Sequence, residues 1–116
     1  MFDSARPQPG DIYLVRFHPG YGAEFKRYRP AVVMAANHMD QRFVLIAPFT
    51  TQTKIYQPET EILIRVNPAL EQDSLLLAWY LQTIDINRLE KKLGRLSSTQ
   101  MRLVKKATSH YFNSIA

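Results

Sequence analysis

The sequence predicts a mainly β protein whose short strands form a small antiparallel barrel and whose chain ends in one α-helix. Five or six short apolar runs of strand length are separated by turn residues such as Pro, Gly, Asn and Asp. These runs do not alternate with helical segments, and this argues against a parallel sheet. After the last run, the apolar residues change to a helical spacing.

The elements can be placed from apolar alternation and turn chemistry. Residues 1–9 are polar, contain two prolines and indicate a loose lead-in, after which Gly10 opens the first strand. Turn residues 37–40 predict that the second and third strands pair antiparallel. Residues 85–89 indicate a helical turn. The predicted strands span residues 12–17, 31–36, 42–48, 59–66, 74–80 and 92–96.

The C-terminal segment carries the signature of a helix start. Ser97 and Gln100 have the spacing of a capping box, in which each side chain bonds the other residue's backbone N–H. An apolar stripe follows at helical spacing, and we expect it to face the core. Its members are Leu103, Val104, Ala107, Tyr111 and Ile115.

Length and composition restrict the class of protein. A chain of 116 residues with 46% hydrophobic residues is expected to form one folded domain over residues 1–116. The chain has no Cys, so disulfides and thiolate metal sites are excluded. We see neither a secretory signal nor an apolar run of membrane-spanning length, and we expect a cytoplasmic protein with no membrane contact. A net charge of +5 and an isoelectric point near 9.7 suit an anionic partner such as nucleic acid or an acidic protein.

The apolar content also predicts a homodimer. A small barrel packed with one helix is not expected to hide every large apolar side chain, and exposed apolar patches commonly mark interfaces. The residues that motivate this expectation are Leu75, Leu76, Leu77, Trp79, Met101, Tyr111 and Phe112.

A basic loop over residues 20–29 is the clearest candidate for a functional site. Arg29 directly precedes Pro30, which favours an extended backbone and places the guanidinium at the root of a strand. A positioned guanidinium suits a phosphate-bearing ligand. A second polar cluster, residues 50–54, follows the next strand. We therefore expect the two segments to form the halves of one site.

Several sequence motifs follow one another along the chain, at Gly10–Val15, Gly22–Val33, Ala47–Lys54, Thr83–Leu89 and Gly94–Ser97. These motifs resemble, in the same order, those of the MazF/PemK family of toxins from type II toxin–antitoxin systems. The resemblance implies an SH3-like β-barrel with a C-terminal helix, usually a homodimer, and a fold class shared with the gyrase poison CcdB. It also implies a metal-independent endoribonuclease that needs no cofactor, cuts single-stranded RNA at short sequences and is held inactive by an acidic antitoxin.

The resemblance assigns roles to individual residues. Arg29 matches the family's catalytic arginine and Thr50 its catalytic threonine, and both are expected to hold the scissile phosphate. Glu24 matches a family acid that orients Arg29 or acts as a base. Amide, ammonium and aromatic side chains nearby are expected to bind RNA through base edges, phosphates and stacking. These candidates are Phe17, Lys26, Arg27, Tyr28, Thr51, Gln52, Lys54 and Gln82.

Each assignment has a structural alternative. The charged side chains of the basic loop can be surface ion pairs, Thr50 and Thr51 can simply end a strand, and Phe17 is favoured as a core residue over a stacking platform. The three histidines lack metal-ligand spacing, so no metal site is expected.

The sequence also departs from the family pattern. Trp79 and Tyr80 stand where family members commonly carry an acid and a glutamine, and Gln82 replaces the usual cation. The two aromatic residues would add surface for stacking bases. The lost acid leaves open an alternative function, a noncatalytic member that binds RNA or inhibits a protein by binding, as the gyrase poison does.

Overall fold

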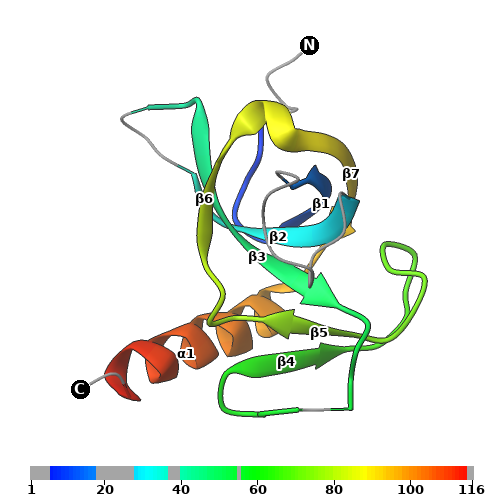
Figure 1. The fold of residues 1–116 in the computed structure, drawn as a ribbon, viewed down its shortest axis with the longest axis vertical. Helices are drawn as coiled ribbons and strands as arrows, with labels where there is room; N and C mark the ends of the chain where they lie inside the picture. Colours follow the sequence, from blue (N-terminus) through cyan, green and yellow to red (C-terminus); the bar gives the residue numbers. More distant parts are fainter. Residues whose placement is uncertain (1–5, 18–27, 37–39, 55, 115–116) are drawn as a thin grey trace.

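The computed structural model describes residues 6–17, 28–36, 40–54 and 56–114, and the structural statements below concern these residues. They form a strongly bent antiparallel sheet beside one long helix, α1 (Ser98–Ser114) (Figure 1). A short 3₁₀ turn, η2 (Ile86–Arg88), links the last two strands. The strands are β1 (Asp11–Arg16), β2 (Tyr28–Ala36), β3 (Phe43–Thr50), β4 (Glu61–Ile64), β5 (Ser74–Leu77), β6 (Gln82–Asp85) and β7 (Leu89–Arg95).

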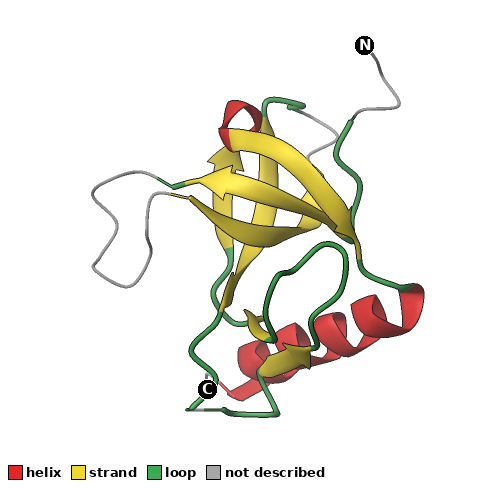
Figure 2. Cartoon of the chain, turned by 90° about the vertical axis from the view of Figure 1, so that its right-hand side faces the viewer, coloured by secondary structure: helices red, strands yellow, loops and turns green. Residues whose placement is uncertain are grey.

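The sheet has the strand order β4-β5-β3-β2-β1-β7, and β6 pairs with β3 beside β5. Strands β6, β3, β2, β1 and β7 curl into a ring, whose two ends are joined by the η2 turn (Figures 1 and 2). Hydrogen bonds between described strands do not close the sheet, so the covalent chain completes the barrel shape where the ladder stops. The expected mainly β fold with a C-terminal helix is thus confirmed.

Two hydrophobic clusters lie on the two faces of the sheet, because successive strand residues point to opposite faces. Val33 of β2 belongs to the cluster inside the ring, whereas its neighbour Val32 belongs to the cluster shared with α1. The helix contributes its buried stripe to the second cluster, namely Met101, Val104 and Ala107. Burial on both faces keeps β2 rigid, which matters because β2 also carries Arg29.

The helix begins as predicted. The Ser97 backbone N–H donates to Gln100 Oε1 at 2.9 Å and the Gln100 backbone N–H donates to Ser97 Oγ at 3.1 Å, so the capping box is confirmed. The predicted apolar stripe was wrong at Leu103, which is 48% exposed, since the face toward the sheet passes through Met101 and Val104 instead. Ile115 lies outside the described residues.

Several strand boundaries differ from the expected ones: β4 and β5 are shorter, and β7 begins earlier, at Leu89. β2 begins at Tyr28, so Arg29 and Pro30 lie inside a strand and not before it. Proline is accommodated there because the recorded pairing of β2 with β3 starts one residue later, at Ala31. Strand β6 was not predicted, because its four residues are short and partly polar and are held as a strand by pairing with β3. The expected turn at 85–89 is confirmed as the η2 turn.

The apolar surplus is smaller than expected. The three leucines of β5 and Met101 are buried within this one chain, so they give no reason for a dimer. Phe112, which is 61% exposed, remains as large apolar surface on α1. Leu76 and Met101 are buried because the β4–β5 end of the sheet and α1 pack into one hydrophobic cluster, and the expected homodimer stays a prediction.

The N-terminal segment is attached to the sheet from Pro7 onward. Pro7 is buried, and the backbone N–H of Gln8 donates to Asp11 Oδ2 at 2.9 Å. Asp11 is itself fully buried and pairs with Arg95 (Nη1 to Oδ1, 2.6 Å) and Lys92 (3.3 Å) of β7. This carboxylate therefore ties the lead-in, β1 and β7 together.

Candidate functional site

Arg29 and Thr50 lie at the adjoining ends of two neighbouring strands, β2 and β3. β2 and β3 pair antiparallel, with Ala31 opposite Pro48. In such a pair, each step back along β2 corresponds to one step forward along β3. Continuing this register by two residues places Arg29 opposite Thr50. Facing residues of an antiparallel pair are about 5 Å apart at Cα, so both side chains can reach one phosphate group.

The Arg29 head is positioned by backbone. Its Nη1 donates to the carbonyl oxygen of Phe49 at 3.4 Å, a long hydrogen bond that holds the guanidinium over the end of β3. Partial burial lowers the pKa of Arg29 from its usual range by desolvation. The group remains cationic at neutral pH, since arginine does not deprotonate in proteins. A partly desolvated cation is weakly screened by water and interacts strongly with an incoming anion.

Thr50 presents a hydroxyl at the last position of β3. Its Oγ1 accepts a hydrogen bond from the backbone N–H of Gln52 at 3.2 Å. This bond uses a lone pair and leaves the hydroxyl proton for donation to a substrate oxygen. Thr50 also pairs with Leu75 of β5, so the hydroxyl is carried by a residue that the sheet holds in place.

The segment after Thr50 is accessible and polar. The side chains of Thr51, Gln52 and Lys54 are exposed. Because they follow Thr50 directly, they line the approach to the Arg29–Thr50 pair. Their expected role in holding RNA stays a prediction.

The two aromatic candidates differ in exposure to solvent. Phe17 is only 2% exposed and packs in the cluster inside the ring with Val15 and Val33, so its proposed role as a stacking platform was wrong and the core alternative is confirmed. Alternation along β1 turns its side chain inward with that of Val15. Tyr28 is 45% exposed and lies next to Arg29 at the start of β2. It is therefore the accessible aromatic ring near the site.

Gln82 is not brought to the site. It pairs with Ile46, four residues along β3 from Thr50, which corresponds to roughly 13 Å. Its expected role in binding RNA, at a distance from the Arg29–Thr50 pair, stays a prediction. Glu24, Lys26, Arg27 and two histidines, His18 and His38, lie outside the described residues.

Trp79 also lies away from Thr50. It follows β5 at the end opposite Leu75, and its indole Nε1 donates to Glu61 Oε2 at 2.9 Å. Its ring packs at an angle against Tyr111 of α1. The side chain is half-buried, and its expected contribution to a base-binding surface stays a prediction.

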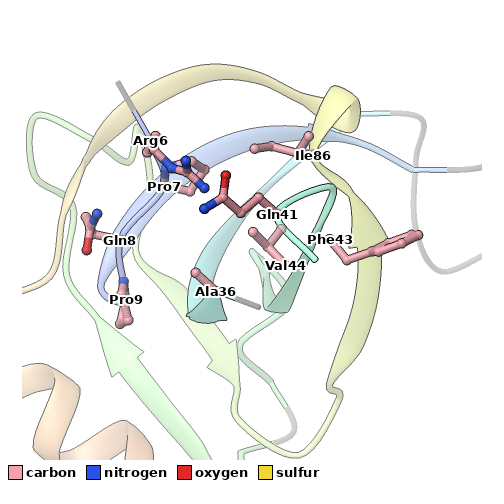
Figure 3. A pocket seen from close by; sticks show the side chains of 9 residues that line it. All are labelled: Arg6, Pro7, Gln8, Pro9, Ala36, Gln41, Phe43, Val44 and Ile86. Carbon is pink, nitrogen blue, oxygen red and sulfur yellow. The ribbon is translucent and has the colours of Figure 1, made fainter. Parts of the chain in front are cut away.

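A hollow that sequence reasoning missed lies at the other end of the sheet. Figure 3 shows it between the N-terminal segment and the ends of β2 and β3, with Gln41 and Phe43 at its rim. Its volume is about 360 Å³. Ala36 lines it and is seven residues from Arg29 along β2, roughly 23 Å. The hollow is thus separate from the Arg29–Thr50 pair.

The backbone carbonyl group of Phe49 belongs to the site but could not be recognised from the sequence. The Phe49 carbonyl that orients Arg29 is a backbone acceptor, which every residue type supplies. It could have been found only from the register of β2 against β3, which also sets the facing positions of Arg29 and Thr50.

The described part of the chain offers neither a cluster of metal ligands nor a membrane-spanning helix. No three His, Asp or Glu side chains there gather closely enough to hold a metal ion. None of its helices is both long and apolar enough to cross a membrane.

The sequence of the chain is similar to those of known proteins. Residues 8–112 match the family model of the PemK-like, MazF-like toxins of type II toxin–antitoxin systems. An endoribonuclease MazF from Staphylococcus saprophyticus is 31% identical over 102 residues, which cover 84% of this chain and 84% of that protein.

Solved structures share the fold at lower identity. MazF from Deinococcus radiodurans superposes with a TM-score of 0.76 at 20% identity, covering 92% of this chain and 96% of that one. An endoribonuclease in complex with its cognate antitoxin from a mycobacterial species superposes with a TM-score of 0.71 at 18% identity, covering 92% and 95%. The fold class expected from the sequence is confirmed by these structures.

Proposed function

Because the chain belongs to the PemK-like, MazF-like toxins of type II toxin–antitoxin systems, we propose that it is an endoribonuclease that binds the scissile phosphate of single-stranded RNA between Arg29 and Thr50. Two observations support this proposal: the hydrogen bond from Arg29 Nη1 to the Phe49 carbonyl oxygen, and the register of β2 against β3, which faces Arg29 with Thr50 when it is continued by two residues. The proposal takes the whole chain as a single toxin domain acting in the cytoplasm, where messenger RNA is translated.

The chemistry needs no group beyond the RNA and the protein. The ribose 2′-hydroxyl attacks phosphorus, the bond to the 5′-oxygen breaks, and a cyclic phosphate and a 5′-hydroxyl result. One proton leaves the 2′-oxygen and one is delivered to the 5′-oxygen. Arg29 binds two phosphate oxygens through its fork and stabilises the charge that builds on them. Thr50 donates its hydroxyl proton to the same phosphate as a hydrogen bond.

The remaining candidates are proposed as supporting groups. Glu24 orients Arg29 or takes the proton of the 2′-hydroxyl. The exposed polar side chains after β3 hold flanking nucleotides, with Gln52 toward base edges and Lys54 toward a phosphate. Tyr28 stacks on an unpaired base, which is worth about 1–3 kcal/mol per base where it occurs.

The proposed partners follow from the charge of the groove. An acidic antitoxin segment binds over Arg29 and Lys54 and excludes RNA, because both ligands present negative charge to the same cations. The chain is proposed to act as a homodimer, and light scattering at micromolar concentration is expected to give twice the 13.5 kDa mass of one chain. A monomer mass would contradict it.

The noncatalytic alternative rests on the family acid that is lost at Trp79. Trp79 lies at the far end of β5 from the residue that pairs with Thr50. The loss of the family acid at this position therefore leaves the Arg29–Thr50 pair unchanged, and this favours the catalytic function.

The test is cleavage of a mixed-sequence, single-stranded RNA by the purified protein in EDTA. Arg29→Ala is expected to lose about 10²–10³-fold in rate, the typical effect of removing one donor to a developing oxyanion. Arg102→Ala removes an equal charge from the exposed face of α1 and is expected to cut like the parent. Equal cleavage by Arg29→Ala and the parent would overturn the mechanism, and a parent that binds RNA without cutting it would favour the noncatalytic alternative.

A further inference from the structure

A hollow of about 480 Å³ lies between the C-terminal part of α1 and the residues that flank β4 and β5. Figure 1 shows α1 passing beside the β4–β5 pair. The volume falls within the range of roughly 300–1,000 Å³ typical of small-molecule sites. We call it the Trp79 hollow, and the side chains that give it its chemistry are Glu59, Glu61, Trp79, His110 and Tyr111.

Glu61 is a buried carboxylate without a cation beside it. The residue is 8% exposed, and its two oxygens accept from the Gln57 backbone N–H and from Trp79 Nε1, each at 2.9 Å. Both donors are neutral, and none of the ion pairs among the described residues includes Glu61. A buried charge is costly unless an opposite charge compensates it. The hollow beside it offers space for such a charge.

Aromatic rings complete the surroundings. Trp79 packs against Tyr111 with ring centroids 6.2 Å apart and planes tilted by 44°, so the two rings form an angled wall. The ring of Tyr80 also packs against Trp79, with ring centroids 5.3 Å apart. A cation over the face of Trp or Tyr is attracted by the ring quadrupole, most strongly for Trp. The hollow therefore attracts a cation in two ways, through the carboxylate of Glu61 and through the aromatic rings.

The local charge contrasts with that of the whole chain. The chain carries a net charge of +5, yet the described lining of the hollow holds two acidic side chains, Glu59 and Glu61, against one imidazole, His110, and neither Lys nor Arg. Complementary charge of this kind selects and orients a partner. The hollow is thus unsuited to RNA and suited to a positive group.

We propose that the Trp79 hollow binds an arginine side chain presented by a partner peptide. A guanidinium is planar, so it can stack on the Trp79 ring while its fork bonds a carboxylate, whereas an ammonium is a compact and strongly hydrated charge. Glu61 is the buried acceptor and Glu59, at the exposed rim, is the second. This inference is independent of RNA cleavage, because the hollow lies away from Thr50.

The experiment uses the full chain, whose single tryptophan is Trp79. Its fluorescence is followed while a short peptide with one arginine is added, and the matched peptide carries citrulline, the neutral isostere of arginine. A saturable change is expected with arginine, with at least tenfold weaker binding of citrulline because the charge-assisted hydrogen bonds are lost. A lysine peptide is expected to bind several-fold more weakly than arginine. Equal responses to arginine and citrulline would overturn the proposal.

Variants place the binding in the hollow. Glu61→Gln is expected to weaken arginine binding about tenfold or more, whereas Glu71→Gln removes an equal charge from an exposed position elsewhere and is expected to bind like the parent. If Glu61→Gln fails to fold, Tyr111→Leu tests the same hollow, with about two- to fivefold weaker binding from loss of one aromatic face. Unchanged binding in the folded variants would refute the site. RNA cleavage is measured in parallel and is expected to be unaffected by the peptide.

Discussion

The facing arrangement of Arg29 and Thr50 predicts that the two residues act on one phosphate and are energetically coupled. The perturbation is a double-mutant cycle with Arg29→Ala, Thr50→Val and the combined variant. If both side chains bind the same phosphate, removing one loosens it, and the second removal then costs less than it does alone. The cycle therefore tests the register of β2 against β3 through chemistry.

The magnitudes follow from the type of each contact. Loss of the partly desolvated guanidinium is expected to cost about 3–4 kcal/mol of transition-state stabilisation. Loss of the neutral Thr50 hydroxyl is expected to cost about 0.5–1.5 kcal/mol. Because the pair is adjacent, we expect the double variant to lose about 0.5–1 kcal/mol less than the sum of the two.

The assay is single-turnover cleavage of a fluorescent single-stranded RNA in EDTA, with all variants checked by thermal unfolding. Thr50→Ser is the matched control, since it keeps the hydroxyl that accepts from Gln52 and loses only a methyl group. It is expected to cut at a rate close to the parent's. Strict additivity of the two losses, within about 0.3 kcal/mol, would refute a shared phosphate.

Two further predictions concern stability. Asp11→Asn removes the buried charge that pairs with Arg95 at 2.6 Å, and it is expected to lower the free energy of unfolding by about 1–3 kcal/mol, measured as a lower denaturant midpoint; an unchanged midpoint would contradict the role given to Asp11. Hydrogen bonds from Arg42 lower the pKa of Asp40 from 3.8 to about 2. The contribution of the Asp40–Arg42 pair to the stability of the fold is therefore present above pH 4 and is lost as the pH falls toward 2. The difference in melting temperature between the parent and Arg42→Ala is therefore expected to shrink to zero over that interval, and a constant difference would exclude the linkage.

Local patterns in the sequence were sufficient for most elements. Alternation along residues 12–17 predicted β1 and its two faces, and the Ser97–Gln100 spacing predicted the helix start, because both depend on neighbours within a few residues. β6 was missed because four partly polar residues become a strand only by pairing with β3. The exposure of Leu103 was missed because the direction from which the sheet meets the helix is not a local property.

The same division holds for function. The sequence by itself determined that Arg29 and Thr50 are the candidate catalytic pair, since their surrounding motifs resemble those of the toxin family. Only the tertiary structure decided that the two residues face each other, that Phe17 belongs to the core, and that Glu61 lies buried under Trp79. These outcomes depend on strand register and on packing between segments far apart in the chain, and both are set by the burial of the whole set of apolar side chains at once.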